Sequence, residues 1–209
     1  MLAATNDGIY RSTDGGTSWD QKYSSASKVQ DLIANPSNFN TQFAAVNGYG
    51  VIKSVDAGVT WGTKTPGIGS AQRIEIAISS TDTTRLFAAV EAGSASDLYM
   101  SDSSGNQWYN AKEQTGIAPN WLGGQGWYDN TISVHPYSKD TVFVGGAGSV
   151  HKISINPGQS SVTSRAVDTT GTASFLAFVN FGLPYLGGGV GSGDNFFSPT
   201  LPPTSLTGP

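Results

Sequence analysis

The residues best suited to chemistry in this 209-residue chain stand in a short stretch near the N-terminus. Residues 12–19 read STDGGTSW and combine a carboxylate, two glycines and several hydroxyl groups. Such a cluster could bind a metal ion or a phosphate, or it could be a structural turn. The elements that surround it in the chain decide between these alternatives.

The composition favours an all-β protein with many turns. Charged residues make up 12% of the chain, hydrophobic residues 37%, and glycine occurs 27 times. Short strands joined by polar turns fit this balance better than helices do. The hydrophobic share is sufficient for one large core or two small ones.

Charge and residue usage exclude several partners. The net charge is -4 and the lysines and arginines are not clustered, so we expect no nucleic-acid partner. No apolar run approaches the roughly 20 residues that span a bilayer, so we expect no membrane insertion. Because cysteine is absent, there is no thiolate nucleophile and no zinc-thiolate site.

The STDGGTSW stretch repeats along the chain. Residues 54–61, SVDAGVTW, share its pattern Ser-x-Asp-x-Gly-x-x-Trp, and residues 101–108, SDSSGNQW, keep it with Ser103 in place of the aspartate. The serines that open the copies are residues 12, 54 and 101, so they lie 42 and 47 residues apart. This period is that of one four-stranded propeller blade.

Strand-like segments surround each copy in a constant order. One segment precedes each copy, and an apolar segment and a second segment rich in Ala and Val lie between copies. The first kind comprises 8–11, 50–53 and 97–100; the pairs between are 31–36 with 42–46, 73–78 with 86–90, and 130–136 with 141–145. The repeating unit is therefore three strands, the repeated turn and a fourth strand.

These motifs resemble the Asp-box (BNR) repeats of sialidase-type and sortilin-type β-propellers, which also occur in xyloglucanase-like glycoside hydrolases and secreted bacterial proteins. The resemblance covers about residues 1–156 and implies an all-β propeller of about four four-stranded antiparallel blades. In those families the box is a turn between the two outer strands of a blade, far from the propeller axis. The opening stretch is therefore expected to be structural.

The resemblance also implies a role for each box residue. The aspartates accept backbone N–H groups inside the turn, the glycines permit positive φ, and the tryptophans pack between blades. The expected structural residues are Ser12, Asp14, Gly16 and Trp19; Ser54, Asp56, Gly58 and Trp61; and Ser101, Gly105 and Trp108. We expect no metal there, because the aspartate is replaced in the third copy while the surrounding pattern persists.

The chain is expected to form an incomplete circle of blades. Residues 1–180 would hold the blades and 181–209 a Gly/Pro-rich C-terminal segment. The N-terminal residues 1–4 look like the second strand of a blade, and 173–179 look like a first strand. Either this late strand completes the first blade in a four-bladed ring, or other segments or subunits complete a larger propeller. We favour the second, because proteins with this repeat usually have more blades.

Three carboxylates are the candidates for catalysis, because they lie on or next to the expected inner strands. Asp31 and Glu75 occupy the same position of two such strands, and Asp129 precedes a third. Two of them about 5 to 9 Å apart could serve as acid and base in glycoside hydrolysis. We favour the alternative that they line a solvated channel, since no catalytic segment of the xyloglucanases can be matched here.

Other catalytic and cofactor chemistries are not expected. Sialidases need three arginines that bind a carboxylate of the substrate, and they carry an Arg-Ile-Pro motif. This sequence has four arginines in all and lacks the motif. His135 and His151 have no acidic partner at ligand spacing and are expected to be structural. The glycines of 187–193 lack the Lys-Ser/Thr of a phosphate loop. We expect no metal and no cofactor.

The segment 120–128, NWLGGQGWY, is the most suggestive surface feature. Trp121, Trp127 and Tyr128 could stack on sugars or anchor a protein partner, or they could fill the entrance between blades. The sequence thus indicates an extracellular, non-catalytic binding or scaffold propeller for a glycan or protein partner, with any export signal upstream of this chain. The alternative is a piece of a xyloglucanase-like glycoside hydrolase.

Overall fold

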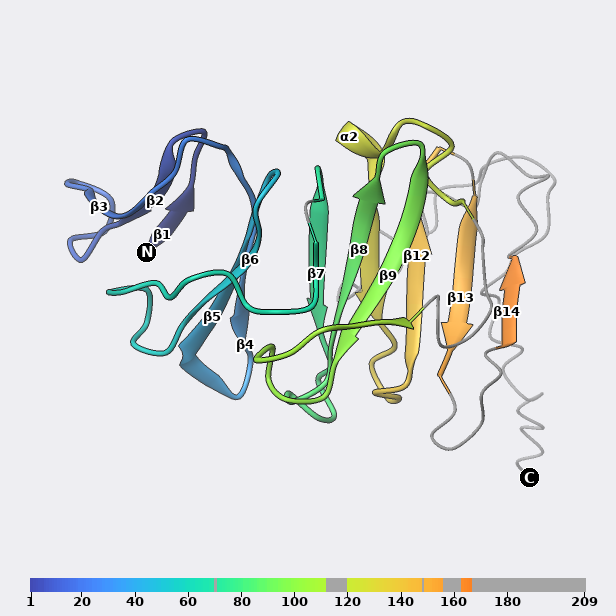
Figure 1. Cartoon of the computed structure of the whole chain (residues 1–209). Coiled ribbons are helices and arrows are strands. Elements are labelled where there is room, and N and C mark those ends of the chain that lie inside the picture. The colour runs from blue at the N-terminus through green and yellow to red at the C-terminus, as the bar shows by residue number, and fades with distance from the viewer. Residues whose placement is uncertain (70, 112–119, 148, 156–162, 167–209) are drawn as a thin grey trace, which may run out of the picture. The chain divides into compact units, whose positions relative to one another are not determined.

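Four antiparallel sheets follow one another along the chain (Figure 1). The computed structural model describes residues 1–69, 71–111, 120–147 and 149–155 and the backbone of 163–166. The first sheet holds β1 (Leu2–Ala4), β2 (Gly8–Arg11) and β3 (Asp20–Ser24), and the second holds β4 (Val29–Asn35), β5 (Asn38–Val46) and β6 (Gly50–Ser54). The third holds β7 (Ile74–Ile78), β8 (Leu86–Ala92), β9 (Ala95–Ser101) and β10 (Tyr109–Asn110), and the fourth holds β11 (Thr131–Val134), β12 (Thr141–Gly145), β13 (Val150–Ser154) and β14 (Thr163–Ala166).

The order of strands within each sheet follows the order in the sequence, as expected for propeller blades. The first sheet begins at the second strand of the unit, so β1 pairs with β2 and has no first strand beside it among the described residues. The second sheet has its fourth strand only as isolated backbone bonds, Gly62 N–H to Lys53 at 2.9 Å and Thr65 N–H to Val51 at 2.8 Å. The chain is therefore all-β with the architecture of a partial propeller.

The second strand of each of the two central sheets is buried on both faces because neighbouring sheets cover it from both sides. Residues 43–46 in β5 and 86–90 in β8 are buried without interruption. Continuous apolar runs are typical of strands covered on both faces, whereas a strand with one solvated face alternates. The Ala- and Val-rich segments of the sequence are thus the centres of their sheets.

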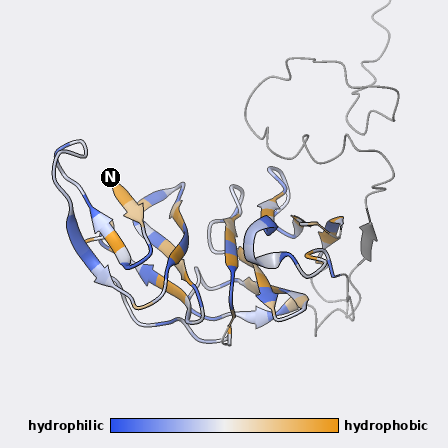
Figure 2. Cartoon of the chain, turned by 90° about the horizontal axis from the view of Figure 1, so that it is seen from above, coloured by the Kyte–Doolittle hydropathy of each residue, from blue (hydrophilic) through white to orange (hydrophobic). Residues whose placement is uncertain are grey.

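Neighbouring sheets pack through three hydrophobic clusters. Contacts run from β1 to β4, from β4 to β7 and from β7 to β11, so the innermost strands meet in chain order. One cluster, with Ile9 and Ile52, lies between the first two sheets; a second, with Phe43 and Ile74, lies between the second and third; and a third, with Phe87 and Val142, lies between the last two. Figure 2 shows the hydrophobic residues on the strands of the sheets.

The antiparallel strands give the sheets two distinct ends. The turns between first and second strands and the three box turns form one end, here called the box end. The connections from one sheet to the next form the other, called the α2 end because the short helix α2 (Gly126–Asp129) belongs to it (Figure 1). The expected late strand at 173–179 and the segment 181–209 lie outside the described residues, so ring closure stays a prediction.

Candidate functional site

The box turns close on themselves through the serine and aspartate side chains. Ser12 Oγ accepts the Gly16 N–H at 2.7 Å and donates to Asp14 Oδ1 at 2.8 Å. Asp14 in turn accepts the Ser18 N–H at 2.9 Å and the Ser18 hydroxyl at 2.6 Å. The carboxylate oxygens are thus occupied by groups of their own turn.

The second and third box turns repeat this geometry. Ser54 Oγ accepts the Gly58 N–H at 2.9 Å, and Asp56 accepts the Thr60 N–H at 2.9 Å and its hydroxyl at 2.6 Å. In the third turn Ser103 Oγ accepts the Gln107 N–H at 3.1 Å. The Ser103 hydroxyl therefore accepts the backbone N–H that Asp56 accepts in the second turn, and the turn keeps its shape with serine in place of aspartate.

The hydrogen bonds also change the acidity of the two aspartates. The Thr60 hydroxyl and N–H stabilise the charged form of Asp56 and lower its pKa to about 2. The Ser18 hydroxyl and N–H lower the pKa of Asp14 in the same way. In the described part of the chain, acidic and histidine side chains form no group of three that could hold a metal ion.

The box tryptophans differ in burial according to the sheet that precedes them. Trp108 is 1% exposed between the second and third sheets and donates its indole N–H to Thr65 Oγ1 at 3.0 Å. Trp61 packs against the cluster between the first two sheets. Trp19 is 38% exposed, because no described sheet lies against its side of the first sheet. Only the second and third of these rings pack between sheets.

A basic side chain joins the second box turn, and another the third, to the sheet that precedes it. Arg11, directly before the first box, donates from Nε to the carbonyl of Ala57 in the second box at 3.2 Å. Lys53, directly before the second box, donates from Nζ to the carbonyl of Ser104 in the third box at 2.8 Å and to Asn106 Oδ1 at 2.9 Å. These contacts are here called the cation bridges. Their carbonyl acceptors, on Ala57 and Ser104, occupy the same position of the second and third box turns.

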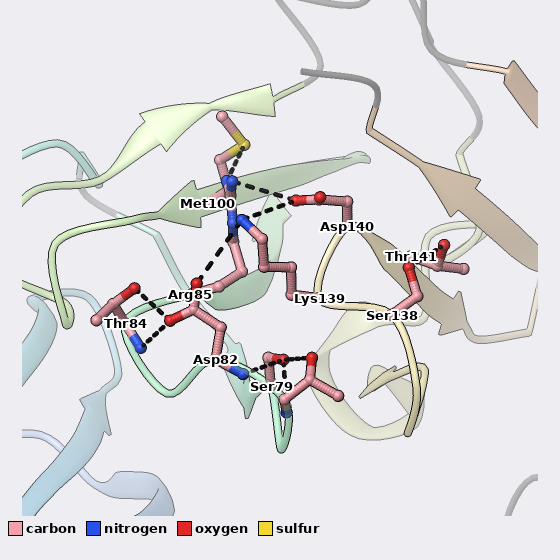
Figure 3. A network of polar contacts seen from close by, with 10 residues as sticks. Ser79, Asp82, Thr84, Arg85, Met100, Ser138, Lys139, Asp140 and Thr141 are labelled. Carbon is pink, nitrogen blue, oxygen red and sulfur yellow. Dashed lines mark hydrogen bonds and ion pairs between the residues drawn. The ribbon is translucent and has the colours of Figure 1, made fainter.

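The junction of the third and fourth sheets uses different chemistry at the box end. Figure 3 shows Arg85 at its centre, with Nη2 3.2 Å from Asp140 Oδ1 and Nη1 donating to the sulfur of Met100 at 3.4 Å. Lys139 lies 3.7 Å from Asp82 and 3.9 Å from Asp140. Met100 stands at the position of the two bridging cations.

The structure brings the first two candidate carboxylates together at the α2 end. Asp31 lies opposite Ala45 on β5 and Glu75 opposite Ala89 on β8, so both occupy the same position of their strands as predicted. Asp31 Oδ2 accepts the backbone N–H of Ile76 on the next sheet at 2.7 Å. Asp31 therefore joins two inner strands, a role that does not require catalysis.

Arg73 connects Glu75 to α2. Its Nη2 and Nε lie 2.7 and 2.9 Å from Glu75 Oε1, and its Nη1 donates to the backbone carbonyl of Trp127 at 3.1 Å. Burial, together with the negative charge of Asp31, raises the pKa of Glu75 from 4.5 to about 7 despite this ion pair. Burial also raises the pKa of Asp31.

Of the three aromatic candidates, the structure exposes two. Trp127 and Tyr128 on α2 are 61% and 48% exposed, and their rings meet edge to face with centroids 4.2 Å apart. The Tyr128 hydroxyl donates to Gln125 Oε1 at 2.5 Å. Trp121 is 1% exposed in the cluster between the third and fourth sheets, so its ring is covered by protein. Below, Trp127 and Tyr128 are called the α2 aromatic pair.

Asp129, the third candidate carboxylate, ends α2, and its Oδ1 is buried without a hydrogen-bond partner among the described residues. Asn130 follows and donates from Nδ2 to the carbonyl of Ala89 at 2.9 Å, which fixes this connection to β8.

Two residues of the site were missed in the sequence: Arg73, and Glu91 at the end of β8. An acidic residue that directly follows the apolar run 86–90 was the available signal for Glu91.

The histidines lie away from this arrangement of carboxylates. His151 on β13 is buried and hydrogen-bonded to Ser149 Oγ through Nε2, and burial lowers its pKa. His135 follows β11 at the box end, where its Nδ1 accepts the Tyr137 N–H at 3.2 Å. Within the described residues no helix is long and apolar enough to cross a membrane.

Part of the chain is similar in sequence to a known protein. No protein-family model matches the chain. A xyloglucanase of Hypocrea jecorina (strain QM6a) is 26% identical over 119 residues, which are 56% of this chain and 14% of the xyloglucanase. The chain therefore spans only a small part of this curated relative.

Solved structures cover more of the chain. YCF48 bound to a D1 peptide superposes with a TM-score of 0.50 and 16% identity over 73% of this chain and 45% of that chain. The GH74 enzyme of Niastella koreensis gives a TM-score of 0.40 at 16% identity, covering 78% of this chain and 35% of its own. The GH74 xyloglucanase of Xanthomonas campestris gives 0.39 at 11% identity, covering 78% and 36%. The likeness to YCF48 and the succession of antiparallel sheets show a partial β-propeller fold.

Proposed function

We propose that this chain is a propeller module that binds a glycan or protein partner through the α2 aromatic pair and does not itself catalyse a reaction. The observation that carries the proposal is the exposure of Trp127 and Tyr128 on a support that is held in place. Arg73 donates to the Trp127 carbonyl at 3.1 Å, and Tyr128 is oriented by Gln125. Exposed aromatic rings on an ordered support are typical anchors in binding sites, because little entropy is lost when they bind.

The location of α2 supports this role. It belongs to the connection between the third and fourth sheets, and function in scaffold folds tends to reside on such connections. The likeness to YCF48, solved with a peptide, favours a protein partner, and the likeness to a xyloglucanase favours a glycan. We keep both classes in the proposal.

We extend the proposal to the parts of the chain that position this site. The three self-bonded turns act as structural Asp-box repeats, residues 1–180 form the blades, and 181–209 form a separate C-terminal segment. Further blades or subunits complete the propeller. They would cover Trp19, which is exposed on the first sheet, whereas Trp61 and Trp108 pack between sheets. The protein acts outside the cell, as secreted proteins with such repeats do.

A glycoside hydrolase is the second candidate, and one observation favours it. Glu75, with its pKa raised to about 7, is suited to donate a proton at neutral pH, and Asp31 stands close enough for its charge to contribute to that shift. Two contacts argue against it. Glu75 is bonded to Arg73, and Asp31 is bonded to the Ile76 N–H, so both carboxylates already have structural partners.

The test combines a binding panel with an activity panel. Oligosaccharides and peptides are screened against the full chain, and Trp127→Ala or Tyr128→Ala is expected to weaken binding by about 1 to 3 kcal/mol, the scale of one lost aromatic anchor. Tyr137→Ala is the matched control, because Tyr137 is 87% exposed but follows β11 at the box end. Equal losses in both variants would contradict the assignment of the site to α2.

The activity arm uses β-glucans and related polysaccharides. We expect no hydrolysis by the wild-type protein. Turnover that disappears in Glu75→Gln or Asp129→Asn while binding persists would establish the hydrolase instead, because a neutral isostere cannot exchange the catalytic proton.

A further inference from the structure

The charges around α2 indicate the chemistry of the partner, an inference that rests on the proposed function. Acidic side chains stand on each element that supports the α2 aromatic pair: Glu75 on β7, Glu91 on β8 and Asp129 on α2 itself. The basic residue that contacts α2 is Arg73, which lies directly before β7. Among the described residues the balance at this site is therefore negative.

Arg73 is not available to an anionic ligand. Two of its guanidinium nitrogens lie 2.7 and 2.9 Å from Glu75 Oε1, and the third donates to the Trp127 carbonyl. Its charge is thus matched within the site and its remaining hydrogen-bonding capacity supports α2. A sulfated or carboxylated partner would meet the remaining carboxylates, and the described part of the site has no unmatched cation to offset them.

Glu91 is the strongest sign that this site favours a cation. It is 6% exposed, and its Oε2 is buried with no hydrogen-bond partner in the described part of the chain. Its side chain lies directly against α2, since a Cβ added at Gly126 would stand 3.0 Å from Glu91 Cγ. Asp129 Oδ1 is buried and unpartnered as well. Carboxylates withdrawn from water without counter-charge are costly, and a bound cation would offset that cost.

The aromatic pair has the complementary property. The faces of indole and phenol rings carry negative electrostatic potential and attract ammonium and guanidinium groups, most strongly for tryptophan. Trp127 and Tyr128 present two such rings on α2, the helix that ends at Asp129 and packs on Glu91 through Gly126. Rings and carboxylates together favour a positively charged side chain over a neutral sugar, which would leave the carboxylates without counter-charge.

We propose that the α2 aromatic pair receives a lysine or arginine side chain of a peptide partner. The cationic group lies against Trp127 and Tyr128, and Glu91 and Asp129 supply its counter-charge. The partner is a basic, extended segment of another protein, attracted also by the overall charge of -4 of this chain.

Calorimetric titration of the full chain with designed peptides tests the proposal. The probes are acetyl-Gly-Lys-Gly-Lys-Gly-Lys-amide, its Arg, Gln and Glu counterparts, and a neutral cello-oligosaccharide. We expect the Lys and Arg peptides to bind, the Gln peptide to bind at least about fivefold more weakly, and the Glu peptide not to bind. Raising the salt from 50 to 500 mM is expected to weaken the Lys peptide severalfold, because screening reduces charge attraction.

Three variants assign the contacts. Trp127→Ala should weaken the Lys peptide by about 3- to 30-fold, and Glu91→Gln should weaken it severalfold without lowering the melting temperature, because the amide keeps the shape of a buried group that lacks a counter-charge. Asp129→Asn should behave like Glu91→Gln. Asp102→Asn, an exposed carboxylate in the third box turn, is the charge control and should leave binding unchanged.

The outcomes separate this inference from the function on which it rests. One outcome is that the Gln peptide or the oligosaccharide binds as tightly as the Lys peptide, with no dependence on salt and with loss of binding in Trp127→Ala. This result would refute the preference for a cationic partner but keep the binding site. Lys-peptide binding that survives Trp127→Ala, or no binding of either basic peptide at millimolar concentration, would also overturn the inference. If no probe showed binding dependent on Trp127, the proposed function itself would fail.

Discussion

The cation bridge of Lys53 should contribute measurably to stability, and replacing Lys53 by methionine tests this with the residue that occurs naturally at the equivalent position in the third repeat. The substitution removes two charge-assisted hydrogen bonds, of 2.8 and 2.9 Å, and a contact of the ammonium with the Phe43 ring at 5.6 Å. Such bonds contribute about 1.5 to 3 kcal/mol each when buried. Here the acceptors on Ser104 and Asn106 remain accessible to water. We therefore expect a total loss of about 1 to 2 kcal/mol.

Chemical and thermal denaturation measure this loss. For a chain of this size it corresponds to a fall in melting temperature of about 3 to 6 °C. Lys53→Arg should retain most of the stability, and Arg11→Met should reproduce part of the loss, since it removes the bridge to Ala57. Lys28→Met is the matched control, because Lys28 is exposed. If Lys53→Met and Lys28→Met had the same effect, the reasoning from the bridge would be refuted.

Three further predictions concern the box turns and the buried carboxylate. Asp56→Ala should lower the melting temperature and leave binding at α2 intact; loss of binding with unchanged melting would make the turn a site. Gly105→Ala should cost about 3 kcal/mol or more, because its Cβ would stand 2.4 Å from Phe43 Cε1, whereas Gly15→Ala, with an empty surrounding, should cost about 1 kcal/mol in the same melts. The difference in free energy of unfolding between the wild type and Glu75→Gln should change with pH. As pH rises from 4.5 to about 7, the wild type should lose up to about 3 kcal/mol relative to the variant, because the folded state holds the proton that the unfolded state releases. A difference that does not depend on pH would contradict the raised pKa of Glu75.

The repeat architecture was the part of the fold that the sequence could predict. The Ser-to-Trp pattern recurs at blade spacing, and the segments 42–46 and 86–90 were placed as second strands, where β5 and β8 are found. These predictions succeeded because local turn chemistry and apolar runs are written in consecutive residues. Whether a box tryptophan is buried depends on the neighbouring sheet, which explains why Trp19 alone of the three is substantially exposed.

The candidate site was less accessible to prediction because tertiary contacts define it. Trp121 and Trp127 stand six positions apart in one segment, yet one is in the core and the other is on the surface. The helix α2 has only four residues, too few for a periodic pattern. Arg73 acquires its role only when Glu75 and the Trp127 carbonyl come together from different elements.

The box end shows how one structural requirement is met by two kinds of chemistry. Each junction between sheets must hold a turn of one sheet against its neighbour. Where the following sheet has a box turn, a carbonyl at a fixed place receives Arg11 or Lys53 from the sheet before it. At the junction of the third and fourth sheets that place holds Met100, whose sulfur accepts a hydrogen bond from Arg85 Nη1. Arg85, directly before β8, pairs with Asp140 at the same junction. The residue directly before the box serine therefore bonds to the sheet that follows in the first two copies, as Arg11 and Lys53, and to its own sheet in the third, as Met100.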